Sequence, residues 1–359
     1  MNNSDMINEL FYQQIGSTWT LDTLFLYLSV PLALIGLILN TLSYLIFKEI
    51  KFQKKQFKIY IKMYTLFSML ICILNVFNSI VSIPRYFDFI LTYAASWYRC
   101  RISTWFSITL YYYTNVIDCV LLLERISNIT NYPLIKSFFK INSYLICFVL
   151  FIICNLTNII SYFFVTPRKD ETYMEVMKNI DLLVNFTYCK REPFFQSTLG
   201  RTISVLVIFV RDGVVLIMEI GLSISSVILF KKYLKAKSIE FFSIISSMNN
   251  NNNCNSNNGQ LNPQQIFDRV QNYNIRLTKM TIYLSIYSIL IHVVVAFSYI
   301  QVSLDIRNPV LMRTVVLISY SLASIKFISN FFLFYYFNPH FRNFFRCKKI
   351  EIDFDVEDE

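Results

Sequence analysis

The side chains that could carry chemistry in this chain are few, and most of them interrupt long apolar runs. Asp118, Glu219 and Lys326 each stand among residues that are otherwise hydrophobic, and Arg211 and Asp212 are adjacent in one such run. An ionisable side chain inside a membrane is costly, so it usually pairs with a partner or marks a ligand or ion path. We therefore expect these residues either to face the interior of a helix bundle or, for Arg211 and Asp212, to pair with each other at its surface.

Catalytic and metal-binding patterns are missing from the sequence. The chain has only two histidines, His292 and His340, too few for a histidine-based metal centre, and no glycine-rich phosphate loop. We interpret His292, in the middle of an apolar run, as a buried hydrogen-bond partner. The sequence therefore predicts no enzyme, no metal site and no cofactor.

The composition requires elements that bury apolar surface in a solvent other than water. Hydrophobic residues make up 55% of the 359 residues and charged residues only 16%, and the mean hydropathy is +0.46. Soluble domains carry about 25% charged residues. A helix of about 20 apolar residues crosses a bilayer and bonds all of its backbone groups internally. Seven runs fit, which predicts an all-α membrane protein with a seven-transmembrane helix bundle, at residues 24–47, 63–83, 102–123, 141–166, 202–230, 280–304 and 314–337.

Basic residues in the connecting segments predict the orientation of the bundle. If the N-terminus lies outside, the inner segments hold 19 Lys and Arg and the outer segments hold 11. We therefore predict a multi-pass plasma-membrane protein with an extracellular N-tail at 1–21 and a bundle at 22–338. The inner basic residues are expected to contact anionic membrane lipid. Without a soluble basic domain, no nucleic-acid partner is expected.

Cysteines and sequons agree with this orientation. Of the eight cysteines, four fall within the predicted spans and two on the inner side. Only Cys100 and Cys189 face the oxidising side, so a single outer pairing is available. Sequons at Asn2 and Asn185 lie on the same side and predict N-glycosylation.

One motif at the third span has a distinctive spacing. Glu124-Arg125-Ile126 places its arginine 25 residues after Cys100. This resembles the rhodopsin-like (class A) G-protein-coupled receptors, in which the same spacing separates the disulfide cysteine from the Asp/Glu-Arg-Tyr motif, with Ile here in place of Tyr. Trp97, three residues before the cysteine, is also placed as in the family's first outer loop.

Motifs in the first and last spans extend the resemblance to about residues 22–349. Gly36 to Asn40 resembles the family's first-helix Gly/Asn pattern, and Asn330 stands where the family has Asn-Pro-x-x-Tyr, without the Pro and Tyr. The stretch 335–342 resembles the entry to the family's short amphipathic eighth helix. The resemblance therefore implies such a helix at 339–349, followed here by an acidic cytosolic tail at 350–359.

The resemblance implies a function and assigns roles to residues. Glu124 would pair with Arg125 at rest, and activation would free Arg125 toward a heterotrimeric G protein. Lys279 and Arg342 would line the same inner cleft. Cys100 and Cys189 would form the family's outer disulfide, and Cys347 would be palmitoylated.

Departures from the family affect the interior and the ligand site. The second span lacks the family's acidic residue, and Asn40, Asp118 and Asn330 are expected to form a polar network in its place, or simple helix–helix hydrogen bonds. Ser324 stands where opsins carry their Schiff-base lysine, and Ser107 where amine receptors carry an aspartate. An extracellular ligand, a peptide or a small molecule, is expected in an aromatic pocket, unless the aromatic residues are core packing. Its candidate residues are Trp105, Ser107, Tyr111, Tyr112, Arg211, Phe297 and Tyr299.

Two other functions remain open from the sequence. A seven-helix ligand-gated channel of the insect-odorant type would not couple to G proteins, but it places the N-terminus inside, against the basic-residue bias. A transporter or membrane enzyme would need several paired charges within the membrane. The Asn-rich stretch at about 247–265 cannot bury a core, so we expect a disordered third inner loop there.

Overall fold

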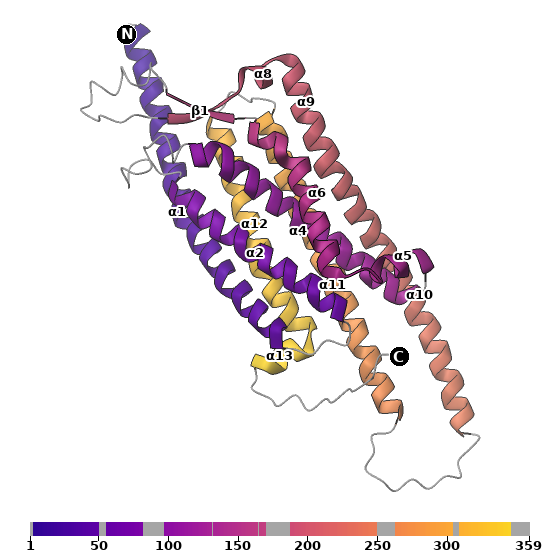
Figure 1. Cartoon of the computed structure of the whole chain (residues 1–359). Coiled ribbons are helices and arrows are strands. Elements are labelled where there is room, and N and C mark those ends of the chain that lie inside the picture. The colour runs from indigo at the N-terminus through magenta and orange to yellow at the C-terminus, as the bar shows by residue number, and fades with distance from the viewer. Residues whose placement is uncertain are drawn as a thin grey trace.

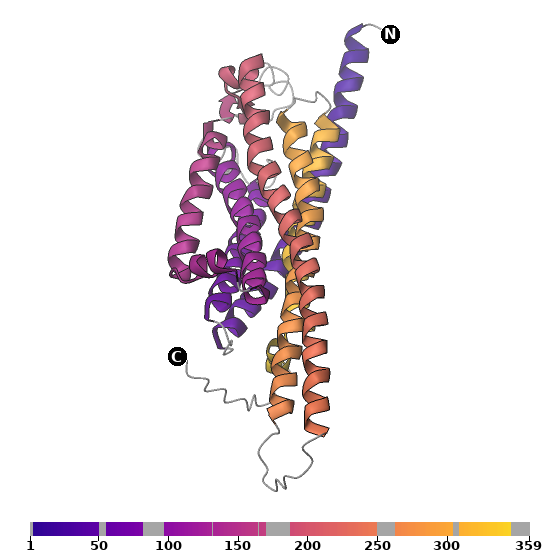
Figure 2. The ribbon, with the colours of Figure 1, turned by 90° about the vertical axis from the view of Figure 1, so that its right-hand side faces the viewer.

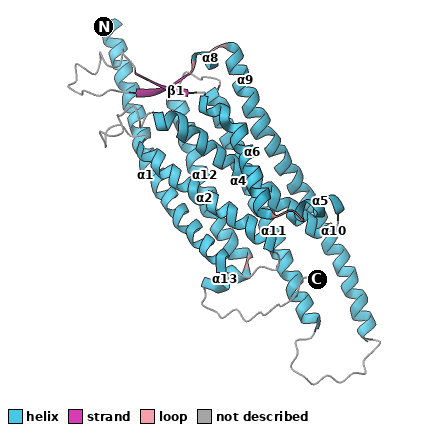
Figure 3. Ribbon diagram, viewed as in Figure 1, coloured by secondary structure: helices cyan, strands magenta, loops and turns pink. Residues whose placement is uncertain are grey.

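The computed structural model is almost entirely helical (Figures 1 and 3). It describes residues 3–49, 55–81, 97–130, 132–163, 165–169, 187–249, 263–303 and 309–345. In chain order the elements are α1 (Asn3–Glu49), α2 (Lys55–Val81), the π-helix η2 (Tyr98–Ser103), α4 (Thr104–Ile129), α5 (Pro133–Phe139), α6 (Ser143–Phe163), β1 (Val165–Lys169), β2 (Thr187–Arg191), α8 (Pro193–Gln196), α9 (Thr198–Ile208), the π-helix η3 (Phe209–Gly213), α10 (Val214–Asn249), α11 (Pro263–Ser303), α12 (Pro309–Phe337) and α13 (Pro339–Phe345).

Seven stretches of helix in the described residues are long and apolar enough to cross a membrane. The seven predicted spans are thereby confirmed, and they indicate a multi-pass membrane protein. Their ends differ from the predicted apolar runs by up to seven residues, in either direction. The spans are Tyr27–Glu49, Gln56–Ser79, Cys100–Ile129, Ser143–Phe163, Thr198–Ala236, Ile275–Phe297 and Leu317–Phe337.

Helices also extend into segments expected to be loop or tail. Helix α1 already begins at Asn3, within the predicted N-tail. Helix α10 ends at Asn249 and α11 begins at Pro263, so both helices reach a few residues into the loop predicted at about 247–265. Residues such as Lys, Ala, Glu and Met favour helix even outside lipid. As a result, α10 and α11 run on together beyond the rest of the bundle (Figures 1 and 2).

The bundle exposes apolar side chains and buries polar ones. On α6, Leu156 is 64% exposed and Phe148 60%, whereas Asn158 on the opposite face has no exposed surface. Soluble proteins show the reverse arrangement. The exposed apolar faces therefore fit contact with lipid, and the interior holds polar and charged groups beside a buried hydrophobic core.

Helix α4 lies at the centre of the bundle, where it contacts α2, α6, α10 and α11. Tyr113 illustrates how it is held. Its ring lies 4.3 Å from the ring of Phe67 on α2 and 5.4 Å from that of Phe151 on α6. Its hydroxyl donates a hydrogen bond to the carbonyl oxygen of Cys147, 3.1 Å away. The charged residues of α4 therefore lie on the most deeply buried of the seven spans.

The last helices are fastened to α1 by aromatic contacts. The Phe47 ring lies 4.9 Å from Phe334 on α12 and 5.3 Å from Phe341 on α13. Asn338 caps α13 because its side-chain oxygen accepts a hydrogen bond from the backbone N–H of Phe341. Helix α13 covers the first residues of the expected eighth helix, and residues 346–359 lie outside the described part of the chain.

A short hairpin covers the end of the bundle from which α1 projects (Figure 1). Strands β1 and β2 pair antiparallel with Pro167 opposite Cys189. Arg101 of η2 forms a 2.6 Å salt bridge with Glu192, directly after β2. Cys100, one residue earlier, is buried and disulfide-bonded. These contacts join the hairpin to the start of α4.

Candidate functional site

Two groups of buried charges are candidates for function, and the first lies near the end of α4. Arg125 is 4% exposed and Glu124 2%. Arg125 Nε lies 3.2 Å from Glu124 Oε2, although the pair lacks hydrogen-bond geometry. The guanidinium carbon lies 3.8 Å from the centre of the Phe57 ring on α2, a cation–π contact. The other Glu124 oxygen accepts a hydrogen bond from Asn128.

The short helix α5 follows this pair and presents an apolar tip. Phe139 packs edge-on against Tyr60 of α2, and its carbonyl oxygen accepts a hydrogen bond from Gln56. Leu134 at the start of α5 is 86% exposed. The two other residues predicted for the inner cleft are an exposed Lys279 on α11 and a half-buried Arg342 on α13.

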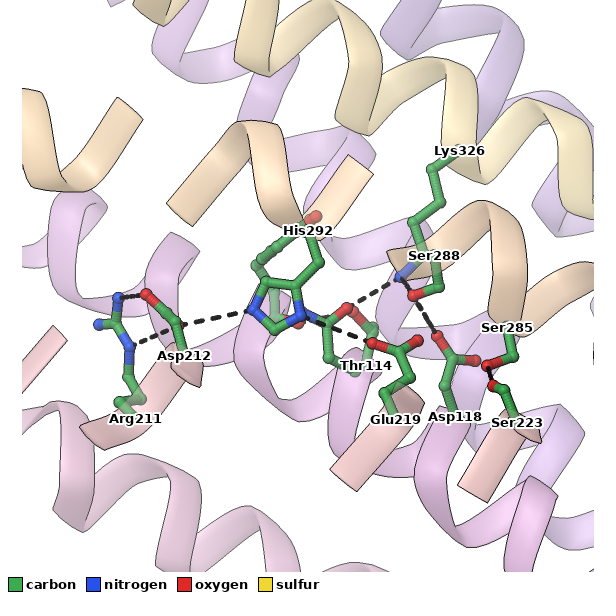
Figure 4. A network of polar contacts seen from close by, with 12 residues as sticks. Thr114, Asp118, Arg211, Asp212, Glu219, Ser223, Ser285, Ser288, His292 and Lys326 are labelled. Atoms are coloured by element: carbon green, nitrogen blue, oxygen red, sulfur yellow. Dashed lines mark hydrogen bonds and ion pairs between the residues drawn. The ribbon is translucent and has the colours of Figure 1, made fainter. Parts of the chain in front are cut away.

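The second group lies in the middle of the bundle and begins with Lys326 of α12 (Figure 4). Its ammonium nitrogen donates to Ser288 Oγ at 2.6 Å, Asn115 Oδ1 at 2.9 Å and Asp118 Oδ2 at 3.2 Å. An ammonium has three N–H donors, so all three are used. Ser288 in turn donates to Asp118 at 2.9 Å. This buried ion pair joins α4, α11 and α12.

Arg211 and Asp212 form a second ion pair in the same group. Arg211 donates through Nε to one carboxylate oxygen of Asp212 at 2.8 Å and through Nη2 to the other at 2.5 Å. Its remaining terminal nitrogen donates to Asn158 Oδ1 on α6 at 2.8 Å. Neighbouring residues on a regular helix point about 100° apart. The π-helix η3 changes that spacing, and both side chains are buried.

His292 of α11 lies between this pair and Glu219 of α10 (Figure 4). Its Nδ1 lies 3.5 Å from Glu219 Oε2 and its Nε2 lies 3.8 Å from Asp212 Oδ1. His292 is 1% exposed and Glu219 fully buried. Within the described part of the chain, neither imidazole nitrogen and neither Glu219 oxygen has a hydrogen-bond partner.

The polar residues predicted to form one network, Asn40, Asp118 and Asn330, are buried, and their hydrogen bonds go to different partners. Asn40 donates to the carbonyl oxygens of Gly36 and of Phe327, which ties α1 to α12. Asn330 donates to the Tyr64 hydroxyl on α2. Asp118 bonds instead to Lys326 and Ser288. The sequence predicted that Asp118 and Lys326 face the bundle interior, but not that they pair with each other.

The residues predicted to form a ligand pocket are also spread out. Tyr111 belongs to the central group, because its ring lies 6.3 Å from the His292 ring and 5.6 Å from Lys326 Nζ. Trp105 instead packs edge-on against Tyr162 of α6. Ser107 accepts a hydrogen bond from Asn78 of α2.

The remaining pocket candidates differ in exposure. Tyr112 is half-buried on α4. Phe297 is 56% exposed at the end of the α11 span. The side chain of Tyr299 lies outside the described residues. Arg211, expected either in the pocket or paired at the bundle surface, is paired and buried.

Several other predicted sites lie outside the described residues. These are the sequon asparagines Asn2 and Asn185 and the candidate lipid-anchor cysteine Cys347. The backbone of Cys189 is described as part of β2, but its side chain is not.

No protein-family model matches the chain, and no curated protein matches it.

Proposed function

We propose that this chain is a plasma-membrane receptor, with its N-terminus outside, that transmits binding of an extracellular ligand to a heterotrimeric G protein. The observation that carries the proposal is Arg125. This arginine is buried at the end of a membrane-spanning helix, and its partners are a neighbouring carboxylate and an aromatic ring. Intramembrane ionisable residues of this kind are functional candidates by default. The sequence resemblance around Arg125 supports the same role.

The proposed mechanism is an exchange of partners at Arg125. In the resting arrangement, Glu124 and Phe57 hold the guanidinium against α2. In the active arrangement, Arg125 turns toward the Gα subunit. A ligand shifts the equilibrium only by its difference in affinity between the two arrangements. The outer ligand must therefore bind the active arrangement more tightly.

The surface around Arg125 supports docking of a protein partner. Leu134 and Phe138, four residues apart on α5, both expose apolar side chains, and contiguous exposed apolar surface marks interaction sites. Lys279 and Arg342 would contribute basic charge to the same inner face. Palmitoylation of Cys347 would anchor the segment after α13.

The proposed outer end is a ligand site beneath a fastened hairpin. We assign the disulfide of Cys100 to Cys189, because β2 carries Cys189 and the Arg101–Glu192 salt bridge holds the neighbouring residues together. Glycans at Asn2 and Asn185 would lie on this side. The ligand is a peptide or a small molecule.

Docking at Leu134 provides a test of the proposal. Leu134→Asp should abolish co-purification of the receptor with a nucleotide-free G-protein heterotrimer, because a charge replaces the apolar contact. The matched control is Leu199→Asp near the start of α9, where the leucine is 64% exposed. Equal recovery of the heterotrimer with both variants would remove the docking surface from the account.

A transporter or channel is a second candidate, favoured by one observation. The buried charges form paired groups, Lys326 with Asp118 and Arg211 with Asp212. Paired charges of this kind also line ion and solute paths. Ion flux through vesicles that contain the purified chain, lost in Asp118→Asn, would favour this candidate over the receptor.

A further inference from the structure

The central group of buried charges is unbalanced when its histidine is neutral. Three carboxylates, from Asp118, Asp212 and Glu219, meet two fixed cations, Lys326 and Arg211, among the described residues of this group (Figure 4). A buried charge without compensation is strongly unfavourable. One further positive charge, or one protonated carboxyl group, would make the group neutral.

The contacts locate the uncompensated carboxylate. Asp118 is paired with Lys326, and Asp212 is paired with Arg211 through two hydrogen bonds. Glu219 is left with His292 as its nearest ionisable partner, at 3.5 Å. The missing proton therefore belongs between the Glu219 carboxylate and the His292 imidazole.

The orientation of His292 fits a protonated ring. An imidazolium carries N–H donors on both nitrogens, whereas a neutral imidazole has one donor and one acceptor. Here the two nitrogens face two different carboxylates, Nδ1 toward Glu219 and Nε2 toward Asp212. A neutral ring would turn a lone pair toward one of these negatively charged groups.

Helices α4 and α12 and the π-helix η3 also place ionisable side chains near the His292 ring. Tyr111 of α4 lies edge-on to the imidazole, with ring centres 6.3 Å apart. Asp118 of α4 and Lys326 of α12 lie beyond it as a neutral pair. Arg211 of η3 is directed at Asp212 and Asn158. These hydrogen bonds of Arg211, like those of Lys326, go to residues other than Glu219.

We propose that His292 and Glu219 form a proton-binding site in the bundle interior, at which one proton from solvent clamps α11 to α10 and η3. The proton adds to the imidazole, and the resulting imidazolium lies between the Glu219 and Asp212 carboxylates. Loss of the proton leaves Glu219 uncompensated and weakens the clamp. Helices α10 and α11 run on together past the bundle (Figures 1 and 2). A weaker contact between them at His292 and Glu219 would therefore also change the position of their far ends. This proposal does not depend on coupling to a G protein.

Nitrogen-15 NMR of histidine tests the site directly. The chain has only two histidines, so the variant His340→Gln leaves His292 as the only imidazole. In purified His340→Gln protein we expect both ring nitrogens of His292 to carry protons at about pH 6, just below the usual pKa of histidine. The protonated signal should persist to higher pH in this protein than after addition of Glu219→Gln. A His292 ring that is neutral at every pH, or a titration that Glu219→Gln leaves unchanged, would overturn the proposal.

Thermal unfolding of the purified full chain gives a second readout. Where the native state holds the proton and the unfolded chain does not, the folded-to-unfolded ratio falls about tenfold per pH unit as pH rises. We therefore expect the Tm of the wild type to fall over the upper part of a scan from about pH 5 to about pH 8. Glu219→Gln removes the excess carboxylate, so it should flatten this slope.

The control for unfolding is Glu192→Gln, which removes a carboxylate of the outer salt bridge instead. It should keep the wild-type slope. If the Glu219→Gln slope equals those of wild type and Glu192→Gln, no proton is bound at this pair. If Glu219→Gln does not fold, the NMR titration of His340→Gln alone decides, because a neutral His292 contradicts the site.

Discussion

Lys326 has no exposed surface, and its ammonium nitrogen lies within 3.2 Å of three oxygen atoms on α4 and α11. At the scale of the residue, an intact ion pair of this kind adds little to stability. Removal of one partner, however, leaves the other as an uncompensated buried charge. A buried ion pair is often no more stabilising than well-packed apolar side chains, but a single buried charge is strongly destabilising. Lys326 and Asp118 should therefore behave as one unit.

A double-mutant cycle on this pair tests that expectation. Asp118→Asn leaves the Lys326 ammonium uncompensated, and Lys326→Met leaves the Asp118 carboxylate uncompensated. Each single change should cost about 3–5 kcal/mol in the free energy of unfolding. The double variant removes both charges and should recover most of that loss. The unfolding free energies of the four purified proteins give the coupling energy, and strictly additive effects would show that the two side chains act independently.

At the scale of the element, Gly36 shows how closely α1 approaches its neighbours. A Cβ atom at this position would lie 2.9 Å from the Cys72 sulfur of α2 and 3.6 Å from Ile328 of α12. One turn later, Asn40 bonds back to the Gly36 carbonyl and across to α12. The absence of a side chain at Gly36 and the hydrogen bonds of the Asn40 amide together hold α1 close to α2 and α12.

Gly36→Ala should therefore destabilise the bundle by about 1–3 kcal/mol, the usual cost of overpacking. Gly221→Ala is the matched control, because a Cβ atom there would meet nothing within 4 Å. In an exposed helix interior, Ala is favoured over Gly by about 1 kcal/mol, so the control should be neutral or stabilising. Thermal unfolding of both variants measures the difference, and equal effects would argue against the close approach.

The seven spans were predictable from sequence, but the π-helices, the β1–β2 hairpin and the partners of the buried side chains were not. The spans follow from apolar length, which needs no knowledge of how the helices are rotated. The pairing of Lys326 with Asp118 depends on the relative rotation of α12 and α4, 208 residues apart in the chain. The burial of adjacent Arg211 and Asp212 accompanies a π-helical turn that hydropathy does not reveal. A count of the charged residues in the spans could have indicated that these residues must pair, but not which residue pairs with which.

At the scale of the whole molecule, the exposed apolar side chains and the buried polar groups fit a bundle surrounded by lipid. The basic-residue bias predicts that the N-terminus, the start of α1 and the β1–β2 hairpin face outside. The long ends of α10 and α11 would then project into the cytosol (Figure 2). This orientation separates the receptor from an N-in channel of seven helices.

Antibody staining of intact cells checks the orientation. A tag placed before residue 1 should be stained without permeabilisation, and a tag after residue 359 should be stained only after it. The C-terminal tag thereby serves as the control for membrane integrity. The opposite pattern would reverse the topology and favour the channel.

Nucleotide exchange on Gα subunits tests the central claim, coupling through Arg125, most directly. The wild type, Arg125→Ala and the outer control Arg201→Ala would be expressed with a panel of Gα subunits and matched for surface amount. The account predicts exchange with at least one subunit, its loss in Arg125→Ala, and its retention in Arg201→Ala. Undiminished exchange in Arg125→Ala would contradict the account, as would no exchange with any subunit from a surface protein oriented N-out.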